Sequence, residues 1–222
     1  TLTEKSYSKV PSSIQVFTKE DIERSGWEYL NDLLIAIDGV SPGETRLFTC
    51  PTVRGIPDNG TGNRLILLID GVPFNFLLYN GGFFDFPLDV VDRVEVLIGP
   101  ASPLYGADAF QGVVNVITSK TDLYDSKVSL SVGNNATFIG SALLNNSLKD
   151  FNFLIHAKGI ESDDFDIEDR KAYPDSNFSS NESTFRKMRS VFAKFDYKNL
   201  SGHFIFYDHF QGYGTYLYTS AK

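Results

Sequence analysis

The fold is decided by residues 91–118, which read VDRVEVLIGPASPLYGADAFQGVVNVIT. Apolar residues alternate at Val94, Val96 and Ile98, and they recur from Val113 to Ile117 with only Asn115 interrupting. Short runs rich in β-branched residues and bounded by glycine are typical of strands buried in a sheet. The stretch therefore predicts two strands joined by a loop that contains glycine.

Glycines mark the ends of the expected strands, where a positive φ or a close backbone approach favours them. The glycines to which we assign this structural role are Gly55, Gly71, Gly99, Gly106 and Gly112. Residues 99–106 could also be compared with a phosphate-binding loop. Such a loop needs Lys and then Ser or Thr directly after its second glycine, and Ala107 follows Gly106 instead. Nucleotide binding is therefore not expected.

Upstream of this stretch, helix and strand patterns mix. Residues 14–17 predict a short strand, and Thr18 with Asp21 three residues later predicts the N-cap of a helix that Gly26 closes. A second helix is expected to end at Gly39, and its apolar face comprises Leu30, Leu33, Leu34 and Ile37. The apolar run 65–69, followed by Asp-Gly, predicts a strand buried on both faces and a turn.

Beyond Asp125 the helical period disappears, and apolar and polar residues alternate as in strands with one apolar face. Strands are expected at 128–132, 137–147, 151–158, 191–197 and 204–210. Tight turns are expected at Lys149-Asp150 and Asn199-Leu200, with a long polar loop at 161–185 between them. Short turns at one end and long loops at the other are typical of outer-membrane barrels. The alternative is an antiparallel sheet of a soluble protein.

Composition excludes several classes of protein. The 28 acidic residues exceed the 20 basic ones, which opposes a nucleic-acid partner because phosphate backbones are bound by clustered Lys and Arg. Cys50 is the single cysteine, so neither an intramolecular disulfide nor a zinc site of several thiolates can form. No apolar run reaches the roughly 18 residues of a membrane-spanning helix, whereas barrel strands need only about 9 to 11.

Successive blocks of the sequence resemble, in order, the plug domain of TonB-dependent outer-membrane receptors. The blocks are residues 10–22, 32–40, 53–56, 68–73, 91–96, 99–106 and 112–118. The resemblance implies an α+β plug domain, a small mixed sheet with short helices, over residues 1–120. Residues 121–222 would then be the first five or so antiparallel strands of an incomplete transmembrane β-barrel. Because family barrels have about 22 strands, the resemblance also implies a truncated chain.

The resemblance further implies a receptor for TonB-energised import of a scarce nutrient, with the plug inside the barrel lumen in the Gram-negative outer membrane. A ferric siderophore or other iron chelate is the expected cargo, and haem and cobalamin are alternatives. The implied partners are membrane lipid and TonB of the TonB–ExbB–ExbD complex, which would grip a segment near or before Thr1, with residues 2–5 as its trailing edge. We expect no enzyme and no cofactor, because no nucleophile, base and orienting group stand at suitable spacing. A soluble secreted binding or adhesin module is the alternative from another class.

The most specific hypothesis about functional residues concerns two arginines. Arg54 and Arg93 match family arginines that pair with glutamates on the barrel wall and hold the plug; the alternative is a pair of exposed arginines. By the same resemblance, ligand contacts are expected at Arg46, Asn59, Asn75, Tyr79, Phe83 and Phe84, whereas Phe74 and Phe76 are expected to pack against the barrel wall.

Alternation places His156, His203 and His209 on one face of the expected sheet, the lumen side. They have no acidic or Cys neighbours at ligand spacing, so a metal site is not expected.

Overall fold

The structure, a computed structural model, describes residues 13–41, 51–55, 65–74, 84–105, 109–120, 126–163 and 186–211. It divides into two compact units, residues 1–120 and residues 121–222, which are described separately below. Within the described residues, no helix has the length and apolar character needed to span a membrane.

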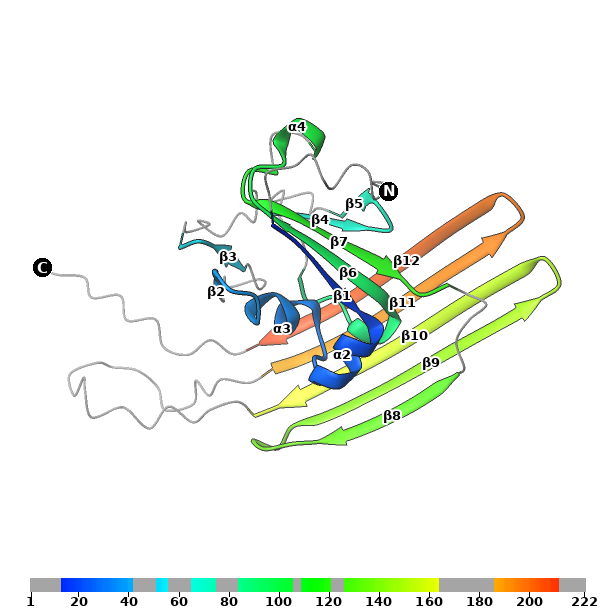
Figure 1. Cartoon of the computed structure of the whole chain (residues 1–222). Coiled ribbons are helices and arrows are strands. Elements are labelled where there is room, and N and C mark those ends of the chain that lie inside the picture. Colours follow the sequence, from blue (N-terminus) through cyan, green and yellow to red (C-terminus); the bar gives the residue numbers. More distant parts are fainter. Residues whose placement is uncertain are drawn as a thin grey trace, which may run out of the picture. The chain divides into compact units, whose positions relative to one another are not determined.

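A five-stranded mixed sheet forms the first unit, with strand order β1-β6-β7-β4-β5 (Figure 1). The strands are β1 (Ser13–Thr18), β4 (Leu65–Ile69), β5 (Val72–Pro73), β6 (Val91–Ile98) and β7 (Gly112–Thr118). Strands β4 and β7 pair in parallel, and the other neighbours pair antiparallel. All five residues of β4 are buried, as expected for a strand covered on both faces.

Helix α2 (Lys19–Ser25) begins and ends where the sequence predicted. Thr18 caps its N-terminus in a reciprocal capping box with Asp21, and Gly26 caps its C-terminus at φ 70° in the left-handed region. These signals are local, because each involves residues within one helical turn of the other. Both ends of this helix can therefore be predicted from the sequence alone.

Helix α3 (Leu30–Ile35) is shorter than predicted. Ala36, not Gly39, is its C-cap, and Ile37 lies beyond the helix although its side chain is 4% exposed. The chain turns through Gly39 at φ 82° into β2 (Val40–Ser41), which pairs with β3 (Thr52–Val53). The predicted residues are all buried, Leu30, Leu33 and Leu34 within the helix and Ile37 in the turn that follows it.

The remaining elements of this unit are the 3₁₀ helix η1 (Leu88–Val90) and helix α4 (Ser102–Tyr105). A buried apolar cluster lies on one face of the sheet, and Ile14 and Tyr105 pack against it. Its members are Ile66, Leu68, Leu97, Ala101, Ala109 and Val113. The loop after β6 and helix α4 thus cover one end of this sheet face.

Four of the five structural glycines have the expected geometry. Gly55, Gly71 and Gly99 have φ values of 66°, 81° and 139°, respectively. At Gly112, a Cβ atom would lie 2.2 Å from the Leu97 carbonyl oxygen, so the neighbouring backbone excludes a side chain. Gly106 lies outside the described residues.

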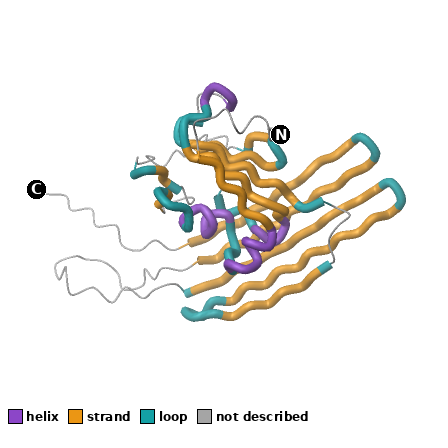
Figure 2. Tube along the Cα trace, viewed as in Figure 1, coloured by secondary structure: helices purple, strands orange, loops and turns teal. Residues whose placement is uncertain are grey.

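The second unit is an antiparallel meander in which each strand pairs with the next (Figure 2). Its strands are β8 (Lys127–Val132), β9 (Phe138–Leu148), β10 (Phe151–Ser162), β11 (Arg186–Tyr197) and β12 (Leu200–Gln211). Strands β9 to β12 have 11 or 12 residues each, enough for the 9 to 11 that a barrel strand needs to cross a membrane.

One of the two tight turns differs from the prediction by one residue. Leu148 pairs with Phe151, which confirms a turn at Lys149-Asp150. At the next hairpin Tyr197 pairs with Leu200, so the turn is Lys198-Asn199 and Leu200 already belongs to β12. Lys149 and Lys198 each have a φ near 55°, because two-residue hairpin turns require positive φ.

Candidate functional site

Arg93 lies on β6 at a β-bulge. The register with β7 runs from Val91 opposite Thr118 to Arg93 opposite Ile117, which leaves Asp92 as an extra residue. Regular strand neighbours point to opposite faces, whereas a bulge re-aims a side chain and brings successive side chains closer. Accordingly, Arg93 Nη1 lies 3.2 Å from Asp92 Oδ2.

A chain of hydrogen bonds leads from Arg93 on β6 to β7 and on to the β4–β5 turn. Arg93 Nε donates to Glu95 Oε1 at 3.0 Å, and Asn115 Nδ2 donates to Glu95 Oε2 at 3.1 Å. The backbone N–H of Gly71 then donates to Asn115 Oδ1 at 3.2 Å. Glu95 and Asn115 lie directly opposite each other on β6 and β7. We call Arg93, Glu95, Asn115 and the Gly71 amide the arginine network.

A second set of bonds fixes the turn at the end of β4. The carboxylate of Asp70 accepts from the backbone N–H of Thr118 at 2.8 Å and from its hydroxyl at 2.6 Å. Asp70 has a φ of 51° and Gly71 one of 81°, which is the geometry of a type I′ hairpin turn. The turn between β4 and β5 is therefore bound to β7 by both of its residues.

Tyr105 packs against the apolar cluster that contains Leu97 and Val113, on the sheet face that also carries Glu95 and Asn115. Burial raises the pKa of the Tyr105 phenol, and the negative charge of Glu95 raises the same pKa further. Both effects disfavour the phenolate, because it would be a second negative charge in a poorly solvated place. The pKa of Tyr105 therefore favours the neutral phenol.

The sequence predicts a role for Arg93 but indicates none for the residues around it. Asp70, Glu95, Asn115 and Thr118 were not assigned a role, although Asn115 gave a usable signal: it is the one polar residue inside the apolar run from Val113 to Ile117. A polar side chain in a buried strand requires a hydrogen-bonding partner. The identity of that partner could not be deduced from the strand itself.

The other predicted arginine, Arg54, is not part of the arginine network. Arg54 follows β3, is exposed and has a φ of 53°. Its backbone N–H donates to the Gly39 carbonyl at 2.7 Å. The described residues thus place Arg93 in a hydrogen-bonded network and Arg54 on a turn, and the proposed pairing of either with barrel glutamates stays a prediction.

Of the predicted ligand contacts, only Phe84 is among the described residues. Its side chain is 1% exposed, and its carbonyl accepts from the N–H of Asn31 at 2.9 Å. Phe84 is thus buried here, beside the start of α3, rather than presented at an apex, because apolar burial favours the interior for so large a ring. The contacts predicted at Arg46, Asn59, Asn75, Tyr79 and Phe83 lie outside the described residues, as does Phe76. Phe74 is half-buried, and its N–H donates to the Leu67 carbonyl.

The three histidines share one face of the second sheet. His156 lies opposite Phe192, and Phe192 lies opposite Ile205, so the odd positions of β12 are on the face of His156. The rings of Phe192 and His203 stack with centroids 6.4 Å apart. No group of three or more potential metal-ligating side chains occurs in the part of the chain that the structure describes.

The opposite face of this sheet is apolar and exposed. Exposed fractions reach 83% at Val132, 61% at Phe204 and 52% at Phe206. Other large exposed apolar residues on this face are Val128, Leu130, Phe138, Leu144, Leu148, Phe151, Ile155, Phe195, Tyr197 and Leu200. An exposed apolar surface this extensive marks an interaction site, since soluble monomers rarely carry one. We call it the apolar face.

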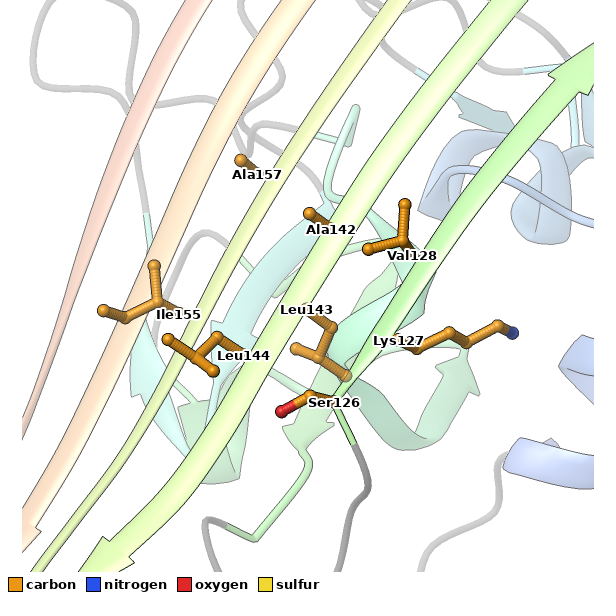
Figure 3. Close-up of a pocket in the computed structure, with 8 residues that line it drawn as sticks. All are labelled: Ser126, Lys127, Val128, Ala142, Leu143, Leu144, Ile155 and Ala157. Carbon is orange, nitrogen blue, oxygen red and sulfur yellow. The ribbon is translucent and has the colours of Figure 1, made fainter.

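Charged residues flank the apolar face at both ends of the strands. Lys149, Asp150 and Lys198 occupy the two tight turns, and Lys187 forms an ion pair with Glu161 near the other end. Between them, the apolar face carries a shallow groove of about 360 Å³ (Figure 3). The groove exists because Ala142 and Ala157, two small residues, lie next to each other between larger neighbours.

Comparison with known proteins assigns the family. Residues 6–113 match the family model described as the TonB-dependent Receptor Plug Domain. The chain belongs to the TonB-dependent receptors, of which it carries the plug domain and part of the barrel. The expected fold class, an α+β plug followed by antiparallel strands of an incomplete barrel, is thereby confirmed.

A relative in sequence is the vitamin B12 transporter BtuB of Vibrio vulnificus (strain CMCP6), which is 31% identical over 171 residues. The match covers 75% of this chain and 28% of the relative. The chain therefore spans less than a third of that protein's length.

Solved structures share the fold. The ferric yersiniabactin uptake receptor FyuA from Yersinia pestis matches with a TM-score of 0.60 and 19% identity, covering 87% of this chain and 30% of that one. A mutant of the ferric enterobactin receptor PfeA from Pseudomonas aeruginosa matches with a TM-score of 0.61 and 18% identity, covering 90% and 34%. These relatives are transporters and receptors rather than enzymes.

Proposed function

We propose that the chain is the N-terminal part of an outer-membrane receptor that imports a scarce nutrient with energy supplied through TonB. One observation carries the proposal: the plug sequence of residues 6–113 is followed by an antiparallel sheet with one exposed apolar face. A protein that spans a membrane with strands needs such a face against lipid. Soluble monomers rarely expose an apolar surface of this extent.

In this proposal the apolar face contacts the hydrocarbon of the outer membrane, and the charged residues at the strand ends lie near its two surfaces. The face that carries the three histidines then lines the lumen. Strand alternation supports this arrangement, because lipid-facing and lumen-facing residues must alternate along every barrel strand.

Import itself requires no covalent chemistry from these residues. Binding of cargo at the plug apices would change how an N-terminal segment is presented to TonB, which is a coupling between two sites. TonB would grip that segment, near or before Thr1, by strand addition. The proposed apical contacts remain Arg46, Asn59, Asn75, Tyr79 and Phe83. Phe84 is no longer among them, because its side chain is buried.

Arg54 and Arg93 are proposed to hold the plug by pairing with glutamates of the barrel wall. The network around Arg93 supports this role, since Nε and Nη1 are engaged within the plug while the guanidinium keeps further donors for another carboxylate. Arg54 is exposed and available for such a pair.

The cargo that we propose is a ferric siderophore or another iron chelate, as the family resemblance implies. Cobalamin is the second candidate, because the relative that is 31% identical is a vitamin B12 transporter.

The test is uptake of labelled ferric siderophores and labelled cobalamin by cells with and without the complete gene, each with TonB present or deleted. Uptake that requires both the gene and TonB supports active import and identifies the cargo. Surface binding that needs the gene but never becomes TonB-dependent uptake would instead indicate a binding module.

A further inference from the structure

The arginine network fixes the direction in which Arg93 points. Glu95 uses one carboxylate oxygen for Arg93 Nε and the other for Asn115 Nδ2. Asn115 in turn cannot rotate its amide, because its oxygen accepts from the N–H of Gly71. Each bond in the chain therefore depends on the orientation of the next group.

The same bonds use two of the three guanidinium nitrogens. Arg93 Nε and Nη1 contact Glu95 and Asp92, and the Arg93 side chain is 37% exposed against 17% for Glu95. Nη2 is the nitrogen that these two contacts do not use. A guanidinium is rigid and planar, so fixing two of its nitrogens also fixes the third.

From this geometry we infer that Glu95 and Asn115 are positioning residues: they hold the Arg93 guanidinium in the orientation in which it pairs with a barrel carboxylate. The inference rests on the proposed function, in which Arg93 holds the plug. It goes further by assigning roles to two residues that act only through Arg93. Preorientation matters because an unrestrained arginine side chain loses rotamer entropy when it is fixed in an ion pair.

The surroundings of Asn115 allow a test by pH. Among the described residues, Asn115 bonds to the carboxylate of Glu95, which also accepts from Arg93. Two further titratable groups lie on neighbouring elements: Asp70, which bonds to Thr118 on the same strand, and Tyr105 of α4, on which the charge of Glu95 acts. Asn115→Asp keeps the oxygen that accepts from Gly71 but places a carboxyl group against the carboxylate of Glu95. Two carboxylates in contact repel when both are ionised, whereas at lower pH the pair shares a proton whose O–H replaces the amide donor.

The experiment uses the receptor from the complete gene in membrane vesicles and measures the urea midpoint of plug unfolding by hydrogen-exchange labelling of residues 91–118. Asn115→Asp should lower the midpoint at pH 8 and restore it to the wild-type value at pH 5. Asn115→Leu, the matched control, cannot donate at any pH and should lower the midpoint equally at both. If the two variants behave alike at both pH values, Asn115 has only a packing role and the inference is overturned.

A double-mutant cycle separates positioning from general stabilisation. If Glu95 acts through Arg93, Glu95→Gln lowers the midpoint in the wild-type background but causes no further loss in Arg93→Ala. Additive losses would contradict the inference, and so would an unchanged midpoint in Arg93→Ala itself. Neither measurement involves cargo or TonB. Failure of the proposed import function in the uptake assay can therefore be distinguished from failure of the positioning role in these unfolding experiments.

Discussion

Asp70 and Thr118 are joined by two hydrogen bonds, at 2.8 Å to the backbone N–H and 2.6 Å to the hydroxyl, although 48 positions separate them in the sequence. This pair binds the β4–β5 turn to the end of β7. We expect Asp70→Ala to destabilise the plug by about 1–3 kcal/mol, because it removes the carboxylate that accepts both of these hydrogen bonds. Urea unfolding measures the loss. Asp70→Asn, which keeps an acceptor oxygen and tolerates positive φ, should cost less; equal losses would contradict the assignment.

Replacing Gly112 by alanine should destabilise the plug more than replacing the helix-capping glycine Gly26. Gly112→Ala places a Cβ 2.2 Å from the Leu97 carbonyl oxygen, so β6 or β7 must shift; we expect a loss on the order of 3 kcal/mol. Gly26→Ala meets nothing within 4 Å and should cost only the roughly 1–2 kcal/mol of the left-handed conformation. Parallel thermal or urea unfolding of the two variants checks the order, and a larger loss in Gly26→Ala would reverse our interpretation.

The capping box of α2 should respond to acid. Hydrogen bonds, first from the Thr18 backbone N–H and then from its hydroxyl, hold the pKa of Asp21 below its ordinary value of 3.8. Because the folded pKa is lowered, the box contributes stability above pH 3.8 and loses it as pH falls through the folded pKa. Thr18→Ala should raise the pKa of Asp21, measured by NMR titration, and Thr18→Ser should not. An unchanged pKa in Thr18→Ala would show that the hydroxyl is not involved.

The two faces of the second sheet should differ in their tolerance of charge. Phe204→Arg places a cation on the apolar face and should impair assembly into the membrane, at a cost of about 2–4 kcal/mol if the residue lies near the bilayer centre. His203→Arg changes the neighbouring residue on the opposite face and should have little effect. Heat-modifiable gel mobility of the complete receptor measures assembly. Equal defects in the two variants would argue against a lipid-facing role.

Removing either proposed plug-holding arginine should loosen the plug. Arg54→Ala and Arg93→Ala should each increase the rate of protease cleavage of the plug several-fold in the complete receptor, because barrel carboxylates lose their partners. Arg24→Ala, at an exposed position in the last turn of α2, is the control. Unchanged protease resistance in both variants would refute the holding role.

Local features of the fold were readable from the sequence. Thr18, Asp21 and Gly26 define α2 without help from the rest of the chain, because cap bonds join residues a few positions apart. The end of α3 was not readable in this way. Ile37 belongs to the apolar pattern but is buried after the helix has ended, and burial alone does not reveal which backbone conformation achieves it.

Register and site geometry required the folded structure. The turn at Lys198-Asn199 was misplaced by one residue, because pairing of Tyr197 with Leu200 depends on the neighbouring strand as well as on the turn sequence. Phe84 suited an aromatic ligand contact in the sequence, yet its side chain is buried. The bulge at Asp92, which lets Arg93 and Asp92 meet, had no recognised signal in the sequence.

The sequence by itself determined two patterns: mixed helix and strand before residue 120 and alternating strands after residue 125. Apolar side chains recur about every 3.6 residues in a helix and every second residue in a strand. Each period can therefore be recognised within one short segment, without knowing which other segments pack against it. The tertiary structure alone decided that Asn115 meets Glu95, 20 positions away, and Gly71, 44 positions away. Such contacts arise only when β4, β6 and β7 pair, and that pairing is driven by burial of the apolar residues of all three strands together.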